Sequence, residues 1–358
     1  MRNLDNQIVW VDKEVKYTLF RNRLEFNIEK SIMALGNILR RGFNHWVVMF
    51  SGGKDSTATV IIALEAALRM MSLVDRIDII YSDTLVEIPV IEKYALGFLG
   101  FLEKFERIRG LPLFTHIVQP ALEERFWVCL LGKGYPPPHQ KFRWCTNRLK
   151  IKPAMRVLET CINPNKTVIL TGVRFGESRT RDQRLNLSCR RGGECGQGVW
   201  FQYNSHLQVG YLAPIVHWQE CDVWDFLNYL APSWGYPTRL LENKVYNGRE
   251  TRFGCWMCTV VKQDKTMMKI TALPEWSYLR PLLEFRNYVW KLTRDPSTRI
   301  PRVDGSPGKL KLSVRKELLK NLLNIQEEVG IQLISDEEIV FIHNLWIKEE
   351  RNECGTKV

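Results

Sequence analysis

Short apolar runs alternate with helical repeats along the first part of the chain. Runs typical of strands lie at residues 46–50, 77–81, 114–118 and 168–171, and a fifth is expected at 212–216. Apolar residues at helical spacing fill the intervals between the first three runs. This alternation predicts an α/β fold with a parallel sheet that helices cover on both faces.

The flanking segments have different patterns. Residues 28–39 predict a helix that caps the core, and the Gly- and Pro-rich segments 132–140 and 295–309 predict a loop and a hinge. Helices dominate after residue 218, with clear repeats at 279–290 and 314–325. We therefore expect an N-terminal helical cap (1–40), a sheet domain (41–218) and a helical C-terminal region (219–358).

A glycine turn joins the first predicted strand to the helix that follows it. Gly52 and Gly53 let the backbone approach an anion, and the first N–H groups of the helix point toward it. Lys54 adds a positive charge, while Asp55 is either a Mg²⁺ ligand or an acidic residue favoured by the helix dipole. A plain strand–turn–helix is the less favoured alternative. The expected phosphate-binding residues are Ser51, Gly52, Gly53, Lys54, Asp55, Ser56 and Thr57.

Three separate motifs follow predicted strands, beginning at Ser51, Asp83 and Gly172. In a parallel sheet the carboxyl ends of the strands share one edge, where ligands bind, so we expect one nucleotide site there. Asp83 and Thr84 either contact the nucleotide or cap the helix that begins near Ile88.

Arginines crowd the stretch after Gly172, and arginine makes bidentate contacts to phosphate. Arg174 is expected to contact the pyrophosphate. The 314–325 helix is expected to carry basic side chains outward. The residues predicted to contact nucleic acid are Arg179, Arg181, Arg184, Arg190, Arg191, Arg315 and Lys316.

Composition adds three constraints. The 358 residues are 45% hydrophobic, enough for a large core, and the net charge is +12. This charge favours a polyanionic partner such as DNA, although a merely basic enzyme is as compatible with charge alone. No apolar run approaches the roughly 20 residues of a membrane span, and the charged start lacks a signal-peptide core. The expected location is cytoplasmic, without a membrane partner.

Nine cysteines in such a chain are better explained as thiols, metal ligands or redox groups than as disulfides. Cys255 and Cys258 form a CxxC pair, which suits a redox couple, half a zinc site or part of an iron-sulfur cluster. A zinc site that adds Cys189 and Cys195 is the alternative to a cluster. The other expectations are packed thiols at Cys129, Cys161 and Cys221, and a frayed tail around Cys354.

Several motifs together resemble a known family. They lie, in order, at residues 51–56 (SGGKDS), 81–89, 143–146 (RWCT), 171–174 (TGVR) with 177–178, and 252–261, and the likeness continues at 234–235, 311–323 and 334–338. The chain is similar over nearly its whole length to the DNA phosphorothioation sulfurtransferases DndC and SspD. These belong to the phosphoadenosine-phosphosulfate reductase-like branch of the PP-loop ATP pyrophosphatases.

The resemblance implies an adenine-nucleotide alpha-hydrolase-like (PP-loop) fold and an ATP-dependent sulfurtransferase that releases AMP and pyrophosphate. DNA would be the substrate, a cysteine desulfurase the sulfur donor, and other phosphorothioation-system proteins the partners. The implied cofactors are ATP, Mg²⁺ and a [4Fe-4S] cluster on Cys145, Cys255 and Cys258. The cysteine that longer relatives have shortly before residue 252 is missing here. We therefore assign the fourth position to Cys195, or alternatively to Cys189 or to an open iron position that could hold sulfide. The implied catalytic residues are Lys54, Asp55, Arg174 and Cys145.

Two other functions fit parts of the sequence. A sulfonucleotide reductase would use Cys354, in Glu-Cys-Gly, as a nucleophile on a small substrate. A nucleotide-sensing DNA-binding subunit would keep the ATP loop and the positive charge without catalysis.

Overall fold

A computed structural model describes residues 13–176, 200–204, 207–246, 254–292 and 294–355. Its centre is a six-stranded sheet with the order β3-β2-β1-β4-β6-β5. All neighbouring strands are parallel except β5 and β6, which are antiparallel. The predicted α/β class is confirmed. The strands are β1 (His45–Phe50), β2 (Arg76–Ser82), β3 (Leu113–Val118), β4 (Thr167–Leu170), β5 (Trp200–Asn204) and β6 (Val209–Ala213).

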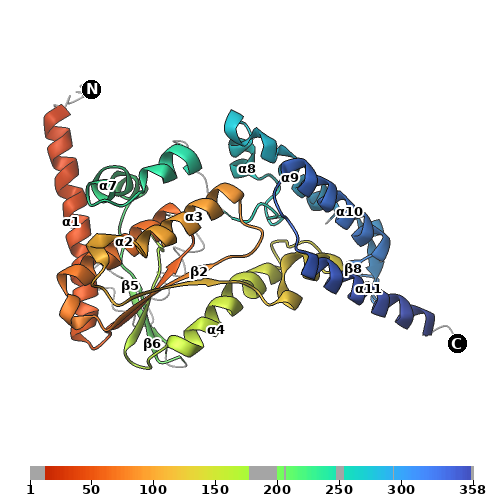
Figure 1. The fold of residues 1–358 in the computed structure, drawn as a ribbon, viewed down its shortest axis with the longest axis horizontal. Coiled ribbons are helices and arrows are strands. Elements are labelled where there is room, and N and C mark those ends of the chain that lie inside the picture. Colours follow the sequence, from red (N-terminus) through yellow and green to blue (C-terminus); the bar gives the residue numbers. More distant parts are fainter. Residues whose placement is uncertain (1–12, 177–199, 205–206, 247–253, 293, 356–358) are drawn as a thin grey trace, which may run out of the picture.

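Helices cover both faces of this sheet (Figure 1). Side chains alternate along β1, so Trp46, Val48 and Phe50 enter the large core with helices α1, α2 and α3, while Val47 packs with α4 on the other face. Helix α2 is buried over most of its length, which explains its nearly continuous apolar sequence. The bounds are α1 (Lys13–Arg40), α2 (Lys54–Arg69), α3 (Pro89–Leu102) and α4 (Lys152–Cys161).

The second half of the chain is mainly helical, as expected, and in Figure 1 helices α8 to α11 group at the end of the molecule away from α1. The helices are α6 (Glu220–Asp225), α7 (Ala231–Ser233), α8 (Lys265–Ile270), α9 (Arg280–Leu292), α10 (Leu312–Val329) and α11 (Asp336–Gly355). Short helical turns are η1 (Met71–Leu73), η2 (Glu106–Ile108), η3 (Leu122–Glu124), η4 (Val128–Gly132), η5 (Thr146–Ile151), η6 (Phe226–Leu230), η7 (Leu241–Tyr246), η8 (Pro274–Leu279) and η9 (Pro296–Thr298).

Three elements differ from the prediction. The strand expected at 212–216 is β6 at Val209–Ala213, since Pro214 has no N–H to donate to a ladder. Strand β5 was missed, and it pairs only at the sheet edge. The hinge expected at 295–309 contains β7 (Arg299–Pro301) and β8 (Pro307–Leu310), which pair as a small antiparallel sheet.

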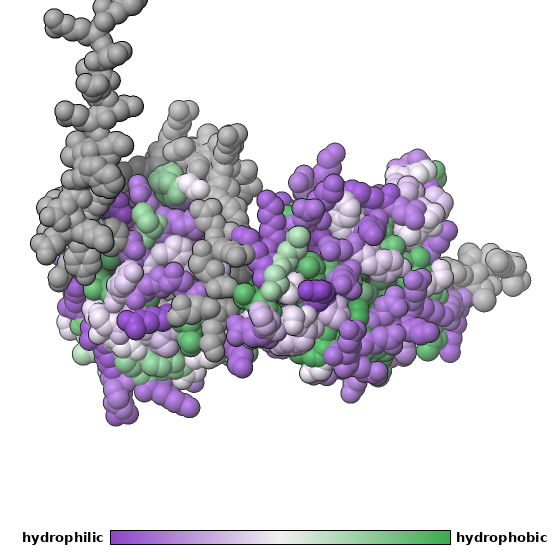
Figure 2. All heavy atoms as spheres, turned by 90° about the horizontal axis from the view of Figure 1, so that it is seen from above, coloured by the Kyte–Doolittle hydropathy of each residue, from purple (hydrophilic) through white to green (hydrophobic). Residues whose placement is uncertain are grey.

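Hydrophilic side chains cover much of the face seen in Figure 2, and apolar ones lie among them in small groups. Among the described helices, none has the length and apolar character that crossing a membrane requires.

Candidate functional site

The turn after β1 needs glycine for two reasons. Gly52 has φ +74°, in the left-handed region, and a Cβ there would lie 2.9 Å from the Cβ of Ala95 on α3. Gly53 precedes the first residue of α2 and provides no side-chain cap, so the N-terminal N–H groups of the helix are left for another acceptor. The local geometry is that of an anion cradle.

Hydrogen bonds of side-chain hydroxyls stabilise this turn from within. The Ser51 N–H donates to Ser56 Oγ at 3.2 Å, and the hydroxyls of Ser56 and Thr57 donate to the carbonyl of Gly53 at 3.0 and 2.9 Å. Both hydroxyl protons are therefore used within the loop, and they stabilise its fold.

The cations of the cradle lie in a compact ion-pair network. Lys54 Nζ lies 3.3 Å from Asp55 and 3.1 Å from Glu220, and Arg174 Nε lies 2.5 Å from the other oxygen of Asp55. Lys54 and Arg174 are 8% and 4% exposed. Burying two cations on shared carboxylates costs desolvation energy, which a polyphosphate could offset by adding negative charge.

Gly172 brings the end of β4 against the start of α2. A Cβ at this position would lie 2.9 Å from the carbonyl of Asp55 and from the N of Ser56. This close approach requires glycine, and it places Arg174, two residues later, on Asp55. The structure thus brings the 51–57 and 172–174 motifs together.

Tyr246, from the distant turn η7, completes the cradle and was not predicted. Its hydroxyl accepts the N–H of Lys54 at 3.1 Å, its ring centre lies 5.6 Å from Lys54 Nζ, and Trp224 packs edge-on against it. Burial raises the pKa of this phenol, so it stays a neutral hydroxyl. The hydroxyl occupies a place that a phosphate oxygen would take at this N–H group.

Asp83 closes a tight turn after β2. Its carboxylate accepts the N–H of Leu85 at 2.9 Å and the amide of Gln119 at 2.8 Å, and Leu85 has φ +62°. The capping alternative for Asp83 and Thr84 is wrong, because α3 begins at Pro89 after Ile88, which makes no side-chain cap. The Thr84 hydroxyl instead donates to Glu87 at 3.0 Å.

The cysteine pair is attached to this same turn. The Trp256 N–H donates to the carbonyl of Val86 at 3.0 Å, and Cys255 forms an isolated β-bridge with Glu87. The loop that carries Asp83 at one end therefore holds Cys255 at the other. The turn that begins at Asp83 and the segment of the cysteine pair are therefore in direct contact.

Cys255 and Cys258 differ in acidity although they share a turn. A hydrogen bond from Cys255 lowers the pKa of Cys258 to about 6, and the same bond raises that of Cys255. Burial raises the pKa of Cys145, which also feels the negative charge of Cys258. The three thiols predicted to act together are therefore close enough to interact.

The spacing of these thiols bears on the metal that they would hold. Cys145, Cys255 and Cys258 do not have all three sulfurs within 4.8 Å of one another. The zinc alternative combines Cys255 and Cys258 with Cys189 and Cys195, and the latter two lie outside the described residues.

Arg286 holds the loop behind the pair and was also missed. Its fully buried guanidinium donates to the carbonyls of Cys258 (2.9 and 2.7 Å), Lys262 (2.9 Å) and Val261. These bonds fix the path of the chain leaving Cys258. No sequence pattern marks Arg286, because the carbonyls that it binds are more than twenty residues away.

Arg315 does not face outward, and its assignment to nucleic acid is wrong. It is 0% exposed and donates to the carbonyls of Leu310 (3.1 Å), Leu131 (3.4 Å) and Gly132 (2.8 Å) and to Glu349 (2.8 Å). Its neighbour Lys316 is exposed and pairs with Glu350 at 2.8 Å. The predicted nucleic-acid residues Arg179, Arg181, Arg184, Arg190 and Arg191 lie outside the described part of the chain.

The remaining described thiols behave differently from one another. Cys129 is buried, and burial raises its pKa to about 11, so it is a packed thiol as predicted. Cys221 is exposed and accepts from Arg23 at 3.2 Å, so the same prediction is wrong there. The side chain of Cys354 is not among those described.

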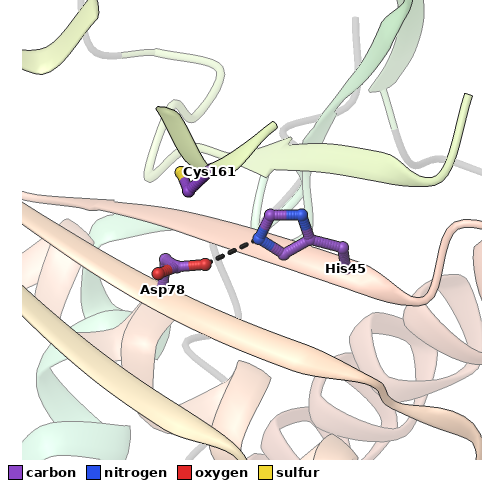
Figure 3. A group of neighbouring side chains, drawn as sticks. All are labelled: His45, Asp78 and Cys161. Atoms are coloured by element: carbon purple, nitrogen blue, oxygen red, sulfur yellow. Dashed lines mark hydrogen bonds and ion pairs between the residues drawn. The ribbon is translucent and has the colours of Figure 1, made fainter. Parts of the chain in front are cut away.

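Cys161 lies in a polar cluster at the opposite edge of the sheet, where β1 and β2 begin (Figure 3). Ligand atoms of His45, Asp78 and Cys161 lie within 4.8 Å of one another, a set that can hold a metal. The Asp78 carboxylate, however, already accepts from His45 (2.6 Å), His116 (2.6 Å) and, at both oxygens, Arg76. Burial, the largest single influence, would raise the pKa of Asp78, but these bonds and the charge of Arg76 together lower it below its usual value. The cluster is satisfied as a hydrogen-bonded network.

The sequence was compared with protein families and with known proteins. The family described as the phosphoadenosine phosphosulfate reductase domain matches residues 45–261. An uncharacterised protein of Methanocaldococcus jannaschii is 28% identical over 221 residues, which is 61% of this chain and 37% of that protein. The chain thus matches just over a third of the length of that relative.

Two solved structures were also similar. Phosphoadenylyl-sulfate reductase from Candida auris, in a phosphate complex, gives a TM-score of 0.40 at 14% identity, covering 69% of this chain and 97% of that one. FMN adenylyltransferase from Candida glabrata, in complex with FMN and an ATP analogue, gives a TM-score of 0.37 at 14% identity, covering 64% of this chain and 62% of that one.

Proposed function

The chain belongs to the phosphoadenosine phosphosulfate reductase domain family, and we propose that within it this protein is an ATP pyrophosphatase that transfers sulfur to the DNA backbone. The observation that carries the proposal is the cradle at the start of α2. There, the uncapped N-terminus of α2, Lys54 and Arg174 lie together, as binding of a triphosphate would require.

The proposed first step uses the residues of the cradle. A nonbridging oxygen of a DNA phosphate attacks the α-phosphorus of ATP, and pyrophosphate leaves. Lys54, Arg174 and the N-terminus of α2 stabilise the charge that develops on the leaving phosphates, which is usually the largest catalytic contribution. We assign Mg²⁺ to Asp55, where the ion would neutralise further phosphate charge. Asp55 would exchange its bond to Arg174 for that role.

The second step replaces AMP by sulfur. The outer sulfur of a persulfide, supplied by a cysteine desulfurase, attacks the activated DNA phosphorus and AMP leaves. A thiolate then attacks the inner persulfide sulfur, so that the phosphorothioate is released and a disulfide remains for a cellular thiol to reduce. We assign the thiol roles to Cys145, Cys255 and Cys258, because Cys255 forms a β-bridge with Glu87, four residues after Asp83. These three cysteines would also be the ligands of an iron-sulfur cluster, with Cys195 or Cys189 completing the set.

The test of the nucleotide assignment is turnover of [α-³²P]ATP with and without DNA. Lys54→Ala should abolish release of AMP and pyrophosphate, while Lys104→Ala, at an exposed position beyond the end of α3, should leave it unchanged. Normal pyrophosphate release by a folded Lys54→Ala protein would refute the assignment.

The sulfur step is tested on the DNA product. Nuclease digestion and mass spectrometry should find phosphorothioate dinucleotides in cells with the active protein and none with Lys54→Ala. Release of sulfite from phosphoadenosine phosphosulfate, without modified DNA, would establish the alternative, a sulfonucleotide reductase. The family match favours that alternative equally.

The cluster is tested by metal content. Protein purified without oxygen should be brown and should lose iron in Cys145→Ser, Cys255→Ser and Cys258→Ser, whereas Cys129→Ser should keep it, because Cys129 is buried elsewhere. One tightly held zinc per chain under iron-replete anaerobic expression would support the zinc alternative instead.

A further inference from the structure

A basic and aromatic surface lies immediately beside Cys145. Residues 139–142 form a tight turn, in which the Phe142 N–H donates to the carbonyl of His139 at 2.9 Å. Phe142 is 42% exposed at this turn, and the exposed side chains of Lys141 and Arg143 flank it. An exposed aromatic ring between two cations is a pairing suited to a polymer that carries both phosphates and planar rings.

The turn is held rigidly against the cysteine segment. The Thr259 hydroxyl donates to the carbonyl of Pro138 at 2.7 Å, and the indole of Trp144 donates to Pro136 at 2.9 Å. Trp144 also stacks on Phe126, with ring centroids 5.4 Å apart. Thr259 directly follows Cys258, so the exposed turn and the cysteine pair have a fixed relation to each other.

A second group of cations lies on η5 and α4, and one of them, Arg148, lies over the ring of Tyr135, whose centroid is 6.5 Å from that of Phe142. Arg148 (3.2 Å), Lys152 (2.5 Å) and Arg156 (3.4 Å) all pair with one buried carboxylate, that of Glu124. Three positive charges on one negative charge leave an excess of two. The side chains of Lys152 and Arg156 are 46% and 50% exposed, so this excess is available to an anion in solvent.

We propose that this surface, made by Lys141, Phe142, Arg143, Lys152 and Arg156, binds a strand of nucleic acid and leads it past Cys145. The inference rests on the proposed function for the identity of the strand as DNA. Phosphates lie on the cations, and one base stacks on Phe142. The surface differs from the predicted one on α10, where Arg315 is buried and Lys316 is paired.

An acidic peptide or an anionic membrane would also pair with the cations, but neither carries a planar ring at every repeat of its charge, as a nucleic acid does. The exposed ring therefore favours nucleic acid, and single strands over duplex, since a base in a duplex is stacked on its neighbours. In a binding assay, loss of the charges should therefore change both the affinity and its salt dependence, whereas loss of the ring should change the affinity alone.

The test is fluorescence anisotropy of the full-length protein with a labelled single-stranded oligonucleotide and with the duplex of the same sequence, over a salt series. The double variant Lys141→Glu, Arg143→Glu should bind at least ten-fold more weakly, and its log-log salt slope should fall by about one to two units. Phe142→Ala should lose roughly 5- to 100-fold in single-strand affinity, with an unchanged salt slope.

Lys104→Glu is the matched control, because Lys104 is exposed just beyond the end of α3, away from the carboxyl edge of the sheet. It should bind both oligonucleotides like the natural protein. Binding of ATP, measured without DNA, should be equal in all these variants, since none of the changed residues lies in the cradle.

Unchanged DNA affinity and salt slope in the double variant would overturn the surface while leaving the proposed activity intact. A protein that cleaves ATP but binds no DNA at low salt would overturn both. Equal affinity for anionic vesicles and for oligonucleotides, with no effect of Phe142→Ala, would show that the surface recognises charge alone and would refute the nucleic-acid assignment.

Discussion

Replacement of Arg315 by alanine tests whether this cation supports the fold or a ligand. The guanidinium is fully buried between α10, η4 and α11, where it binds three backbone carbonyls and the carboxylate of Glu349. Lys316, one residue further along α10, forms an exposed ion pair with Glu350 of α11. The two positions have similar sequence surroundings and opposite burial.

The expected loss follows from what alanine would leave behind. Removing one partner of a buried ion pair typically costs about 3–5 kcal/mol, because the other charge stays buried. Lys309 still lies 3.2 Å from Glu349 and offsets part of this cost, while the three carbonyls lose their donor and add to it. We therefore expect the free energy of unfolding to fall by about 3–5 kcal/mol in Arg315→Ala and by less than about 1 kcal/mol in Lys316→Ala.

The measurement is urea unfolding of both variants, followed by circular dichroism between pH 4 and 8. Burial works against ionisation of Glu349, but hydrogen bonds and charge from Arg315 and Lys309 lower its pKa overall. Because its pKa is lower in the folded state than in the unfolded state, ionised Glu349 stabilises the protein at pH values above the ordinary carboxyl pKa. This stabilisation is lost as the pH falls through the lowered pKa. The gap between the natural protein and Arg315→Ala should therefore be largest near neutral pH and narrow in acid.

Two results would contradict this reasoning. Native stability of Arg315→Ala, together with weakened DNA binding, would mean that Arg315 faces a ligand as the sequence alone predicts. A gap that widens as the pH falls would mean that Glu349 is not the partner that matters.

Three further predictions concern the cradle and its surroundings. Burial raises the pKa of Asp225 from 3.8 to about 6. The stability that the protonated carboxyl contributes is therefore present in acid and is lost as the pH rises to about 6. Asp225→Asn should remove this pH-dependent loss, so the urea midpoint of the variant should fall less between pH 4.5 and 7 than that of the natural protein. Tyr246→Phe frees the N–H of Lys54 and should tighten ATP binding about two- to ten-fold by calorimetry, and weaker binding would show that the hydroxyl contacts the nucleotide instead. Gly172→Ala should push β4 from α2 and reduce ATP cleavage at least ten-fold, because its Cβ would meet the backbone of Asp55 at 2.9 Å; activity equal to that of the natural protein would refute the close approach.

The sequence by itself determined the strands that alternate with helices and the glycine turn that opens α2. These features depend on local rules: side chains alternate across a strand, and a positive φ requires glycine. The motifs at Ser51, Asp83 and Gly172 were predicted to share one edge because a parallel sheet places all its carboxyl ends together. The same local rules fail for β5 and for the β7–β8 pair, which depend on partners rather than on their own pattern.

Only the tertiary structure decided which polar residues face one another. Tyr246 reaches Lys54 across 192 positions of sequence, and Glu124 gathers cations that are 24 to 32 positions away. Arg315 illustrates the physical reason most directly. A helix pattern shows that a charged residue can lie on the polar face, but the carbonyls of η4 and the carboxylate of Glu349 decide that it is buried instead.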